Sequence, residues 1–226
     1  MNWSDAIDGY CERTGPGLWS EPLNALTNVA FLLAALVMWR RTAGNRAPAE
    51  TVLIALLAFI GVGSALFHTF AARWAAVVDV LPIGLFILAY IWAANRTFWA
   101  MPRWAAALGT AAFIPWAVLL EPVFAALPFF RVSAGYWPVA LLIALYGVLL
   151  RGRAPATGRG LLVGAGVLTV SLAARSVDEA WCEAVPLGTH WLWHLLNGAM
   201  LGWMIEVHRK HRAAQSLSAS RSSGVA

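Results

Sequence analysis

Seven long apolar segments, separated by short polar stretches, constrain this chain more than any other feature of its sequence. Runs of about 20 apolar residues match the thickness of a bilayer core. Apolar residues make up 60% of the 226 residues and charged residues only 12%, which is too few charges for the surface of a soluble enzyme. We place the segments at 23–39, 51–70, 75–94, 104–120, 136–150, 161–174 and 189–207.

The segments are continuously apolar, whereas the strands of a membrane barrel alternate apolar and polar residues. We therefore predict an all-α membrane protein with a seven-transmembrane-helix bundle. An extracytoplasmic segment (1–22) precedes the transmembrane domain (23–207), and a basic cytoplasmic tail (208–226) follows it. The end of the tail is rich in Ser and Ala without apolar periodicity, so we expect it to be disordered.

The charged residues predict an orientation. The chain opens with acidic residues and has no basic signal-peptide region, so we expect its N-terminus outside and, after seven spans, its C-terminus inside. This topology places 12 of the 16 basic residues inside and 4 outside, as membrane insertion requires. The inner ones are Arg40, Arg41, Arg46, Arg96, Arg103, Arg151, Arg153, Arg159, Arg209, Lys210, Arg212 and Arg221. A net charge of +5 distributed in this way does not predict a nucleic-acid partner.

Two cysteines lie in outer segments of this topology. Cys11 is in the N-terminal segment and Cys182 is in the loop before the last helix. Both would face an oxidising compartment, so a disulfide between them is geometrically feasible. The alternative is a pair of free thiols.

Five polar side chains stand inside or beside apolar segments, where ionisable groups are costly and mark functional sites. Ser64 and His68 are four residues apart near the end of the second segment, and Asp79 lies early in the third. His190 and His194 share one face at the start of the seventh. The topology brings all three of these helix ends to the outer side, so we expect the five side chains to converge.

Three histidines with one open position are typical of catalytic zinc, which lowers the pKa of a bound water towards about 7. Asp79 would serve as a general base for that water, and the Ser64 hydroxyl would donate to a developing oxyanion. Taken singly, Asp79 could cap a helix and Ser64 could bond its own backbone. Their convergence favours the metal site. His208 and His211 lie at the basic inner end, where we interpret them as interfacial charge.

The motifs carry a resemblance that spans nearly the whole chain. They are GSALFHT at 63–69, Asp79 with Pro82, Asp178 with Cys182, HWLWH at 190–194, YCE at 10–12, and EPLN at 21–24 with Asn28. In these pieces the sequence resembles the alkaline ceramidase family, within a wider superfamily of seven-helix membrane hydrolases and receptors.

The resemblance implies a zinc amidase site within the membrane. His68, His190 and His194 match the family's zinc ligands, Asp79 the residue that activates water, and Ser64 the residue near zinc and the oxyanion. The implied substrate is a membrane lipid, ceramide or a related N-acyl lipid, cleaved to a sphingoid base and a fatty acid. The two cysteines match the disulfide positions of the family.

The resemblance also implies a calcium site in the N-terminal segment, with Asp8, Glu12 and Glu21 as ligands. The sequence departs from the family pattern here, because Gly9 is inserted and Thr14 replaces an expected Asn.

Two other functions stay open at this point. A seven-helix receptor or sensor would keep similar zinc residues without catalysis. A proton-coupled transporter would use His68 and Asp79 as a relay and would bind no metal.

Overall fold

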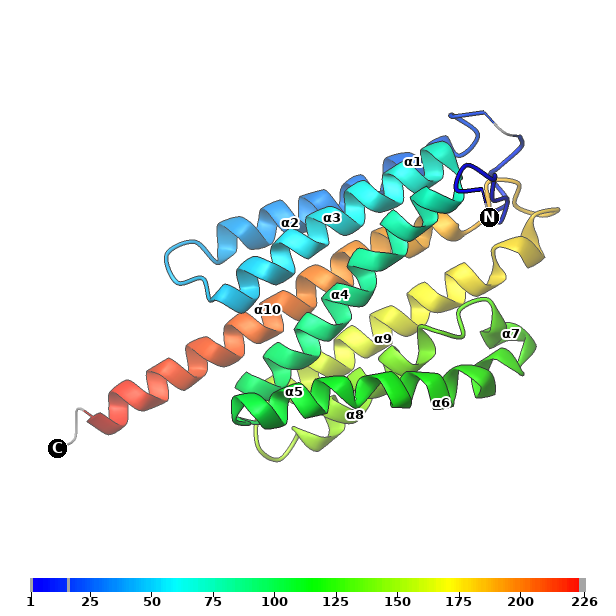
Figure 1. Cartoon of the computed structure of the whole chain (residues 1–226). Coiled ribbons are helices and arrows are strands. Elements are labelled where there is room, and N and C mark those ends of the chain that lie inside the picture. Colours follow the sequence, from blue (N-terminus) through cyan, green and yellow to red (C-terminus); the bar gives the residue numbers. More distant parts are fainter. Residues whose placement is uncertain (1, 16, 224–226) are drawn as a thin grey trace.

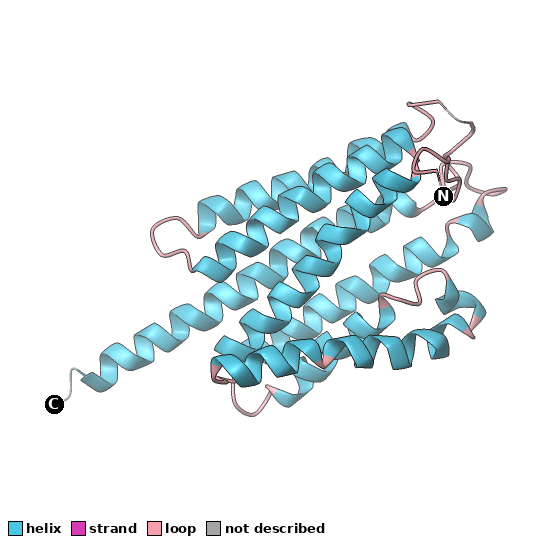
Figure 2. Cartoon of the chain, in the orientation of Figure 1, coloured by secondary structure: helices cyan, strands magenta, loops and turns pink. Residues whose placement is uncertain are grey.

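The computed structural model describes residues 2–15 and 17–223, with side chains as far as residue 218. This part of the chain is helical and contains no strand, only one isolated bridge between Ala6 and Ala72 (Figures 1 and 2). The all-α prediction is confirmed. The helices are α1 (Pro22–Thr27), α2 (Val29–Arg41), α3 (Pro48–Phe70), α4 (Arg73–Thr97), α5 (Arg103–Ala111), α6 (Phe113–Ala125), α7 (Pro128–Arg131), α8 (Trp137–Leu149), α9 (Pro155–Val177), a 3-10 turn η1 (Glu179–Trp181) and α10 (His190–Ser223).

Five helical stretches of the described chain are long and apolar enough to cross a membrane, which indicates a multi-pass membrane protein. They are α1–α2, α3, α4, α5–α6 and α9, with mean hydropathies of 1.6 to 2.1. Helix α8 is apolar but has only 13 residues. Helix α10 is long, but two histidines, Asn197 and Glu206 lower the hydropathy of its first half.

Large apolar side chains cover much of the outer surface of the bundle. Leu119 on α6 is 73% exposed, and α6 has no buried residue. Leu57 and Ile60 on α3, in contrast, are almost completely buried in the core. Lipid accommodates such an apolar exterior, whereas water would not.

Helix α10 packs against α2, α3, α4 and α9, and so forms the centre of the bundle. In Figure 1 the N-terminal segment, the end of α3 and the starts of α4 and α10 lie at one end of the molecule. The α2–α3, α4–α5 and α8–α9 loops and the end of α10 lie at the other. The side chains predicted to converge therefore belong to elements that meet at the same end.

The Cys11–Cys182 disulfide is present and joins residues 171 positions apart. It ties the N-terminal segment to the loop that precedes α10. The disulfide prediction is confirmed, and the alternative of two free thiols is not observed in the structure.

Gly63 allows α3 and α4 to approach closely. A Cβ atom added at Gly63 would lie 2.3 Å from the Val78 carbonyl oxygen and 3.3 Å from the Asp79 Cα atom. The backbones of α3 and α4 cannot make room for this atom unless one of the two helices moves. The close approach places Ser64, the next residue, beside α4.

We expect Gly63→Ala to lower the free energy of unfolding by about 1–3 kcal/mol, as overpacking in a core does. Thermal unfolding in detergent measures this loss. Gly84→Ala on α4 is the matched control, because a Cβ there meets nothing within 4 Å. Equal melting temperatures for the two variants would contradict the packing argument.

The C-terminal region differs from the prediction. Helix α10 continues to Ser223, whereas we expected the Ser- and Ala-rich end of the tail to be disordered, and residues 224–226 lie outside the described part. Residues 208–218 contain good helix formers such as Ala, Arg, Lys and Gln, and no Gly or Pro interrupts them. Arg212 also anchors the helix by donating to Glu50 Oε1 at 2.9 Å.

His208 is not interfacial charge either. It is 1% exposed, and its Nδ1 lies 3.2 Å from Oε1 of the completely buried Glu50. A buried carboxylate needs such partners. His208 and Arg212 therefore compensate the charge of Glu50 inside the bundle. His211 Nδ1 contacts Thr157 Oγ1 at 2.7 Å and links α10 to α9.

Candidate metal centre

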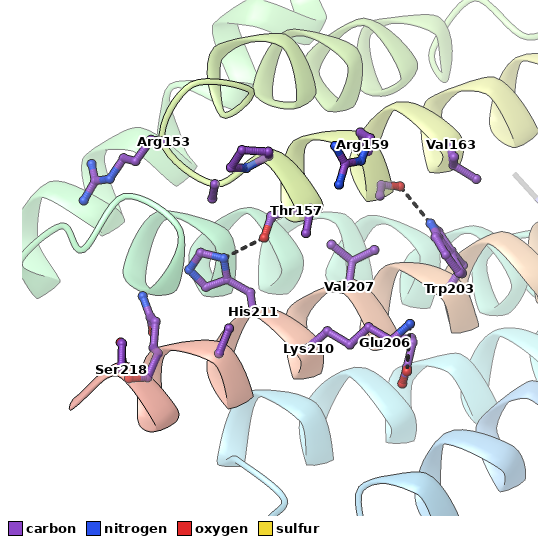
Figure 3. A pocket seen from close by; sticks show the side chains of 16 residues that line it. Arg153, Thr157, Arg159, Val163, Trp203, Glu206, Val207, Lys210, His211 and Ser218 are labelled. Atoms are coloured by element: carbon purple, nitrogen blue, oxygen red, sulfur yellow. Dashed lines mark hydrogen bonds and ion pairs between the residues drawn. The ribbon is translucent and has the colours of Figure 1, made fainter. Parts of the chain in front are cut away.

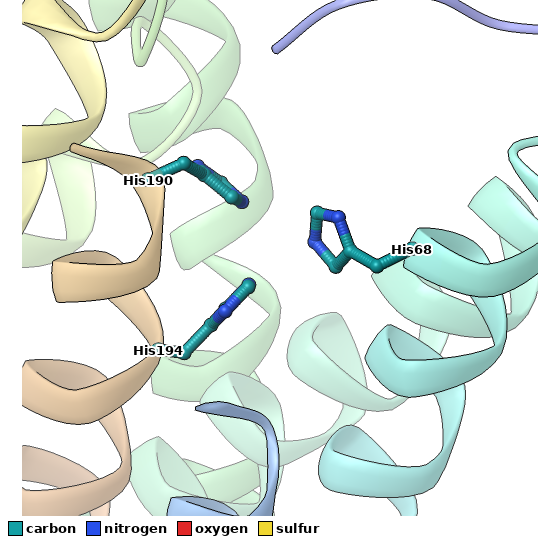
Figure 4. A group of neighbouring side chains, drawn as sticks. All are labelled: His68, His190 and His194. Carbon is teal, nitrogen blue, oxygen red and sulfur yellow. The ribbon is translucent and has the colours of Figure 1, made fainter. Parts of the chain in front are cut away.

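Three buried histidines converge at the end of the bundle that holds the N-terminal segment. His68 comes from the last turn of α3, and His190 and His194 come from the first two turns of α10 (Figure 4). One ring nitrogen of each lies within 4.8 Å of one ring nitrogen of the others, and the three rings face a common point. The predicted convergence of the histidines is confirmed.

The start of α10 is held by a side chain from outside the helix. Asp178 Oδ1 accepts the backbone N–H groups of Thr189 (2.6 Å) and His190 (2.8 Å), and Oδ2 accepts that of Cys11 (3.1 Å). Gly188, with φ of 63°, makes the turn, and a Cβ there would lie 2.2 Å from Asp178 Oδ1. Free N–H groups at a helix start favour an anion. Asp178 therefore fixes the start of α10 at His190.

Outer partners orient two of the rings. His68 Nδ1 lies 2.5 Å from Glu21 Oε2, and His194 Nδ1 lies 2.9 Å from Thr27 Oγ1. The Thr27 hydroxyl donates to the Leu23 carbonyl at 2.8 Å, so it accepts the proton of His194 Nδ1. Each ring then directs a lone pair on Nε2 away from this partner, as in metal-bound histidines.

Glu21 is itself held as an anion. Burial raises the pKa of the Glu21 carboxyl, but its hydrogen bonds with His68 and Arg13 and the positive charge of Arg13 outweigh this and lower the pKa overall. Arg13 pairs with the other oxygen of Glu21, Oε1. The negative charge beside His68 makes its ring a stronger ligand.

The residues fit a metal ion. His190 Nδ1 and His194 Nε2 are buried and have no hydrogen-bond partner among the described residues. An unsatisfied buried polar atom costs about 1–3 kcal/mol, so these nitrogens need a ligand. Neutral imidazole nitrogens in threes are the donor set of catalytic zinc.

We expect Thr27→Val to weaken zinc binding by about 10- to 100-fold, because it removes the acceptor that orients His194. Competition with a chelator of known affinity measures the change. Thr110→Val is the control, since within the described part of the chain the Thr110 hydroxyl donates to the Ala106 carbonyl of its own helix. Equal zinc affinities for the two variants would contradict an orienting role for Thr27.

Ser64 and Asp79 lie beside the histidines. Both line a small, mainly apolar cavity with Tyr136 and Trp193. Asp79 lies within interaction distance of Ser64 and His68. The structure thus brings together all five side chains that the sequence placed on this side.

Two neighbours of the histidines, Tyr10 and Arg175, were not predicted as site residues. Tyr10 stacks on His190 with ring centroids 3.8 Å apart, and burial raises the pKa of its hydroxyl. Arg175 lies 5.7 Å from the ring centroids of both Tyr136 and Trp193. The sequence signal for Arg175 is its position at the end of an apolar segment, where an ionisable residue is costly.

The calcium prediction finds no support in the described residues. The two carboxylate oxygens of Glu12 accept the backbone N–H groups of Leu23 (2.6 Å) and Asn24 (2.7 Å), so Glu12 caps α1. Glu21 is occupied by Arg13 and His68. Asp8 is exposed and does not join them in a metal-ligand group.

Comparison with known families agrees with this geometry. A family model described as Ceramidase matches residues 10–221, which covers most of the chain and all the residues of the centre. A comparison with curated proteins gives no match. The matched range also includes the disulfide, the Glu12 cap of α1 and the whole apolar bundle. The chain therefore belongs to the ceramidase family.

Proposed function

We propose that the protein is a zinc-dependent amidase of the membrane interior, which hydrolyses the amide of ceramide or a related N-acyl lipid. The observation that carries this proposal is the group of three buried histidines with two unsatisfied nitrogens, beside Ser64 and Asp79. A receptor would not require a carboxylate and a hydroxyl next to the metal ligands. Hydrolysis of an amide by water uses both.

His68, His190 and His194 would hold the ion. Zinc, when bound, supplies Lewis-acid polarisation and a water of lowered pKa. Asp79 accepts a proton from the attacking water as the new C–O bond forms, and returns it to the amine nitrogen when the C–N bond breaks. Ser64 donates a hydrogen bond to the carbonyl oxygen as negative charge develops there. The low dielectric around these groups strengthens each interaction.

The apolar interior beside the site supports a lipid substrate. The cavity that contains Ser64 and Asp79 is followed by a second one, and the two share Ile87, Val139 and Met200. A third continues along α4, α8 and α10. A series of apolar cavities from the reacting groups towards the bundle centre suits a hydrocarbon chain.

We also propose seven spans, with the N-terminus and the metal centre on the outer side and the C-terminus in the cytoplasm. In support, α8 and α10 add to the five long apolar stretches, and the N-terminal segment and the end of α10 lie at opposite ends of the molecule. The basic residues 40–46 and 209–212 lie at the end away from the site, as the positive-inside rule requires.

Incubation of the purified protein with a panel of N-acyl lipids tests the function, with zinc measured in the same sample. We expect equal amounts of fatty acid and amine product, and loss of both when a chelator removes zinc. A lipid with an ether in place of the amide is the control. One bound zinc without hydrolysis would favour a receptor, and protein that binds no zinc would favour a transporter.

A further inference from the structure

A separate cavity lies at the opposite end of the bundle, between α9 and α10 (Figure 3). Its volume is about 650 Å³, which makes it larger than the cavity at Ser64 and Asp79. None of its lining residues belongs to the metal centre. We call it the α9–α10 cavity.

Positive charge dominates the lining of this cavity. Arg153, Arg159 and Lys210 line it together with one carboxylate, Glu206, so the formal charge is 3 − 1 = +2. Among the described residues, neither Arg153 nor Arg159 forms an ion pair with an acidic side chain. Two guanidinium groups therefore stand ready for an anion.

Lys210 is also available. Its Nζ lies 3.7 Å from Glu206 Oε1, and its side chain is 61% exposed. Arg209 binds both oxygens of Glu206 at 2.8 Å, and Arg41 binds Oε1 at 3.1 Å. Because these closer partners already satisfy the carboxylate, an anion in the cavity can recruit Lys210 without leaving Glu206 unpaired.

The cavity changes from polar to apolar along the bundle axis. Lys210 and Ser218 lie towards the C-terminal end of α10, while Val163 and Trp203 lie towards the apolar middle of the bundle (Figure 3). The Trp203 indole N–H donates to the Gly160 carbonyl at 2.7 Å, which holds the ring against the wall. A soluble anion needs no apolar wall, whereas a lipid needs both parts.

Packing between the two helices sets the shape of the cavity. A Cβ at Gly160 would lie 2.7 Å from Val207 Cγ2, and one at Gly164 would lie 2.6 Å from Met204 Sδ. The glycines thus let α9 and α10 meet closely beside the cavity. The Thr157–His211 contact joins the helices one turn further towards the end. Arg159 and Lys210 are carried by α9 and α10, and Arg153 lies in the α8–α9 loop two residues before α9 begins.

We propose that the α9–α10 cavity binds the phosphate headgroup of an anionic phospholipid. The phosphate contacts Arg159 and Lys210, and Arg153 adds positive charge at the loop end of the cavity. An acyl chain lies along Val163 and Trp203. Arginine forks match phosphate oxygens, and basic pockets between membrane helices at the cytoplasmic side suit such headgroups. This site needs only the membrane-embedded fold, so it does not rest on the proposed amidase activity.

Native mass spectrometry of the full chain tests the proposal, with phosphatidylglycerol, phosphatidylcholine or inorganic phosphate added separately. We expect phosphatidylglycerol to be retained in preference to phosphatidylcholine. The variant Arg153→Ala/Arg159→Ala/Lys210→Ala should bind it roughly 100-fold more weakly, since each cation near a membrane surface contributes about a fivefold preference.

The matched control is Arg40→Ala/Arg103→Ala/Arg151→Ala, which removes the same charge from exposed residues outside the cavity. It should bind phosphatidylglycerol like the unaltered protein. Equal weakening in both triple variants would show non-specific attraction and overturn the site. Stable binding of inorganic phosphate without lipid selectivity would overturn the lipid assignment. Thermal unfolding of each variant confirms that the fold is intact.

Discussion

We expect His194→Ala to lose its bound zinc and to lower lipid amide hydrolysis by about a thousandfold or more. A catalytic metal contributes several kcal/mol to the transition state, and each 1.36 kcal/mol is a factor of ten in rate. His194 is completely buried, and its Nε2 has no hydrogen-bond partner among the described residues. Its loss leaves two ligands, which is too few for a catalytic zinc site. Metal analysis and turnover on the same purified sample measure both effects.

His211→Ala is the matched control for this variant. His211 lies on the same helix, but it contacts Thr157 at the opposite end of the bundle. We expect it to keep both zinc and activity. The ligand assignment fails if a variant with alanine at His68, His190 and His194 still binds one zinc with unchanged affinity.

Asp79→Asn should keep zinc and lower turnover by about 10²- to 10⁴-fold, the range that general acid–base catalysis contributes. Asparagine preserves the shape of the side chain but cannot accept the proton of the attacking water. Because Asp79 is not one of the three grouped ligands, metal content should not change. Zinc analysis, product release and a melting curve on one preparation separate these effects.

Asp5→Asn provides the comparison for charge alone. Asp5 is about half exposed and pairs with Arg73 at 3.2 Å, and such surface pairs contribute little. Its turnover should match that of the unaltered protein. If Asp79→Asn hydrolyses lipid at the same rate as Asp5→Asn, Asp79 is not the base. If it loses zinc, Asp79 acts in metal binding instead.

The two variants together distinguish the proposed enzyme from its rivals. Loss of metal and activity in His194→Ala, with loss of activity alone in Asp79→Asn, is expected only for a metal-dependent hydrolase. A transporter with a His68–Asp79 relay predicts no zinc in any variant. A receptor predicts zinc without turnover.

Much of the candidate site could be predicted from the sequence because a membrane leaves few choices. Consecutive membrane-spanning helices alternate in direction, so every second connection between them lies on the same side of the membrane. Ser64 and His68 at the end of one helix, Asp79 at the start of the next and His190 at the start of the last are therefore brought to one level. An ionisable residue at such a position is costly, so its presence is informative.

The partners of these residues could not be predicted in the same way. Glu12 and Glu21 are both acidic residues of one outer segment, yet Glu12 caps α1 and Glu21 binds His68 and Arg13. Which of them faces a backbone N–H and which faces a histidine depends on how the N-terminal segment folds over the bundle. No periodicity encodes that path, and the expected calcium site lost its support for this reason.

The C-terminal region shows the same limit. Its composition suggested a solvated tail, but the helix continues because Arg212 and His208 pair with the buried Glu50 of α3. A contact across more than 150 residues has no local signature. The local sequence pattern therefore predicted a shorter last helix than the structure has.

The sequence by itself determined that the chain belongs in lipid. It also determined the positions of the apolar helices and which of their ends lie at the same level. The reason is that the length of an apolar segment and the distribution of charge are local properties on which membrane insertion directly depends. Only the tertiary structure decided which side chains meet. It placed Glu21 beside His68 and Thr27 beside His194, set Asp178 at the start of α10 and formed the basic α9–α10 cavity. These contacts depend on the packing of helices distant in the sequence, and packing is a property of the whole bundle.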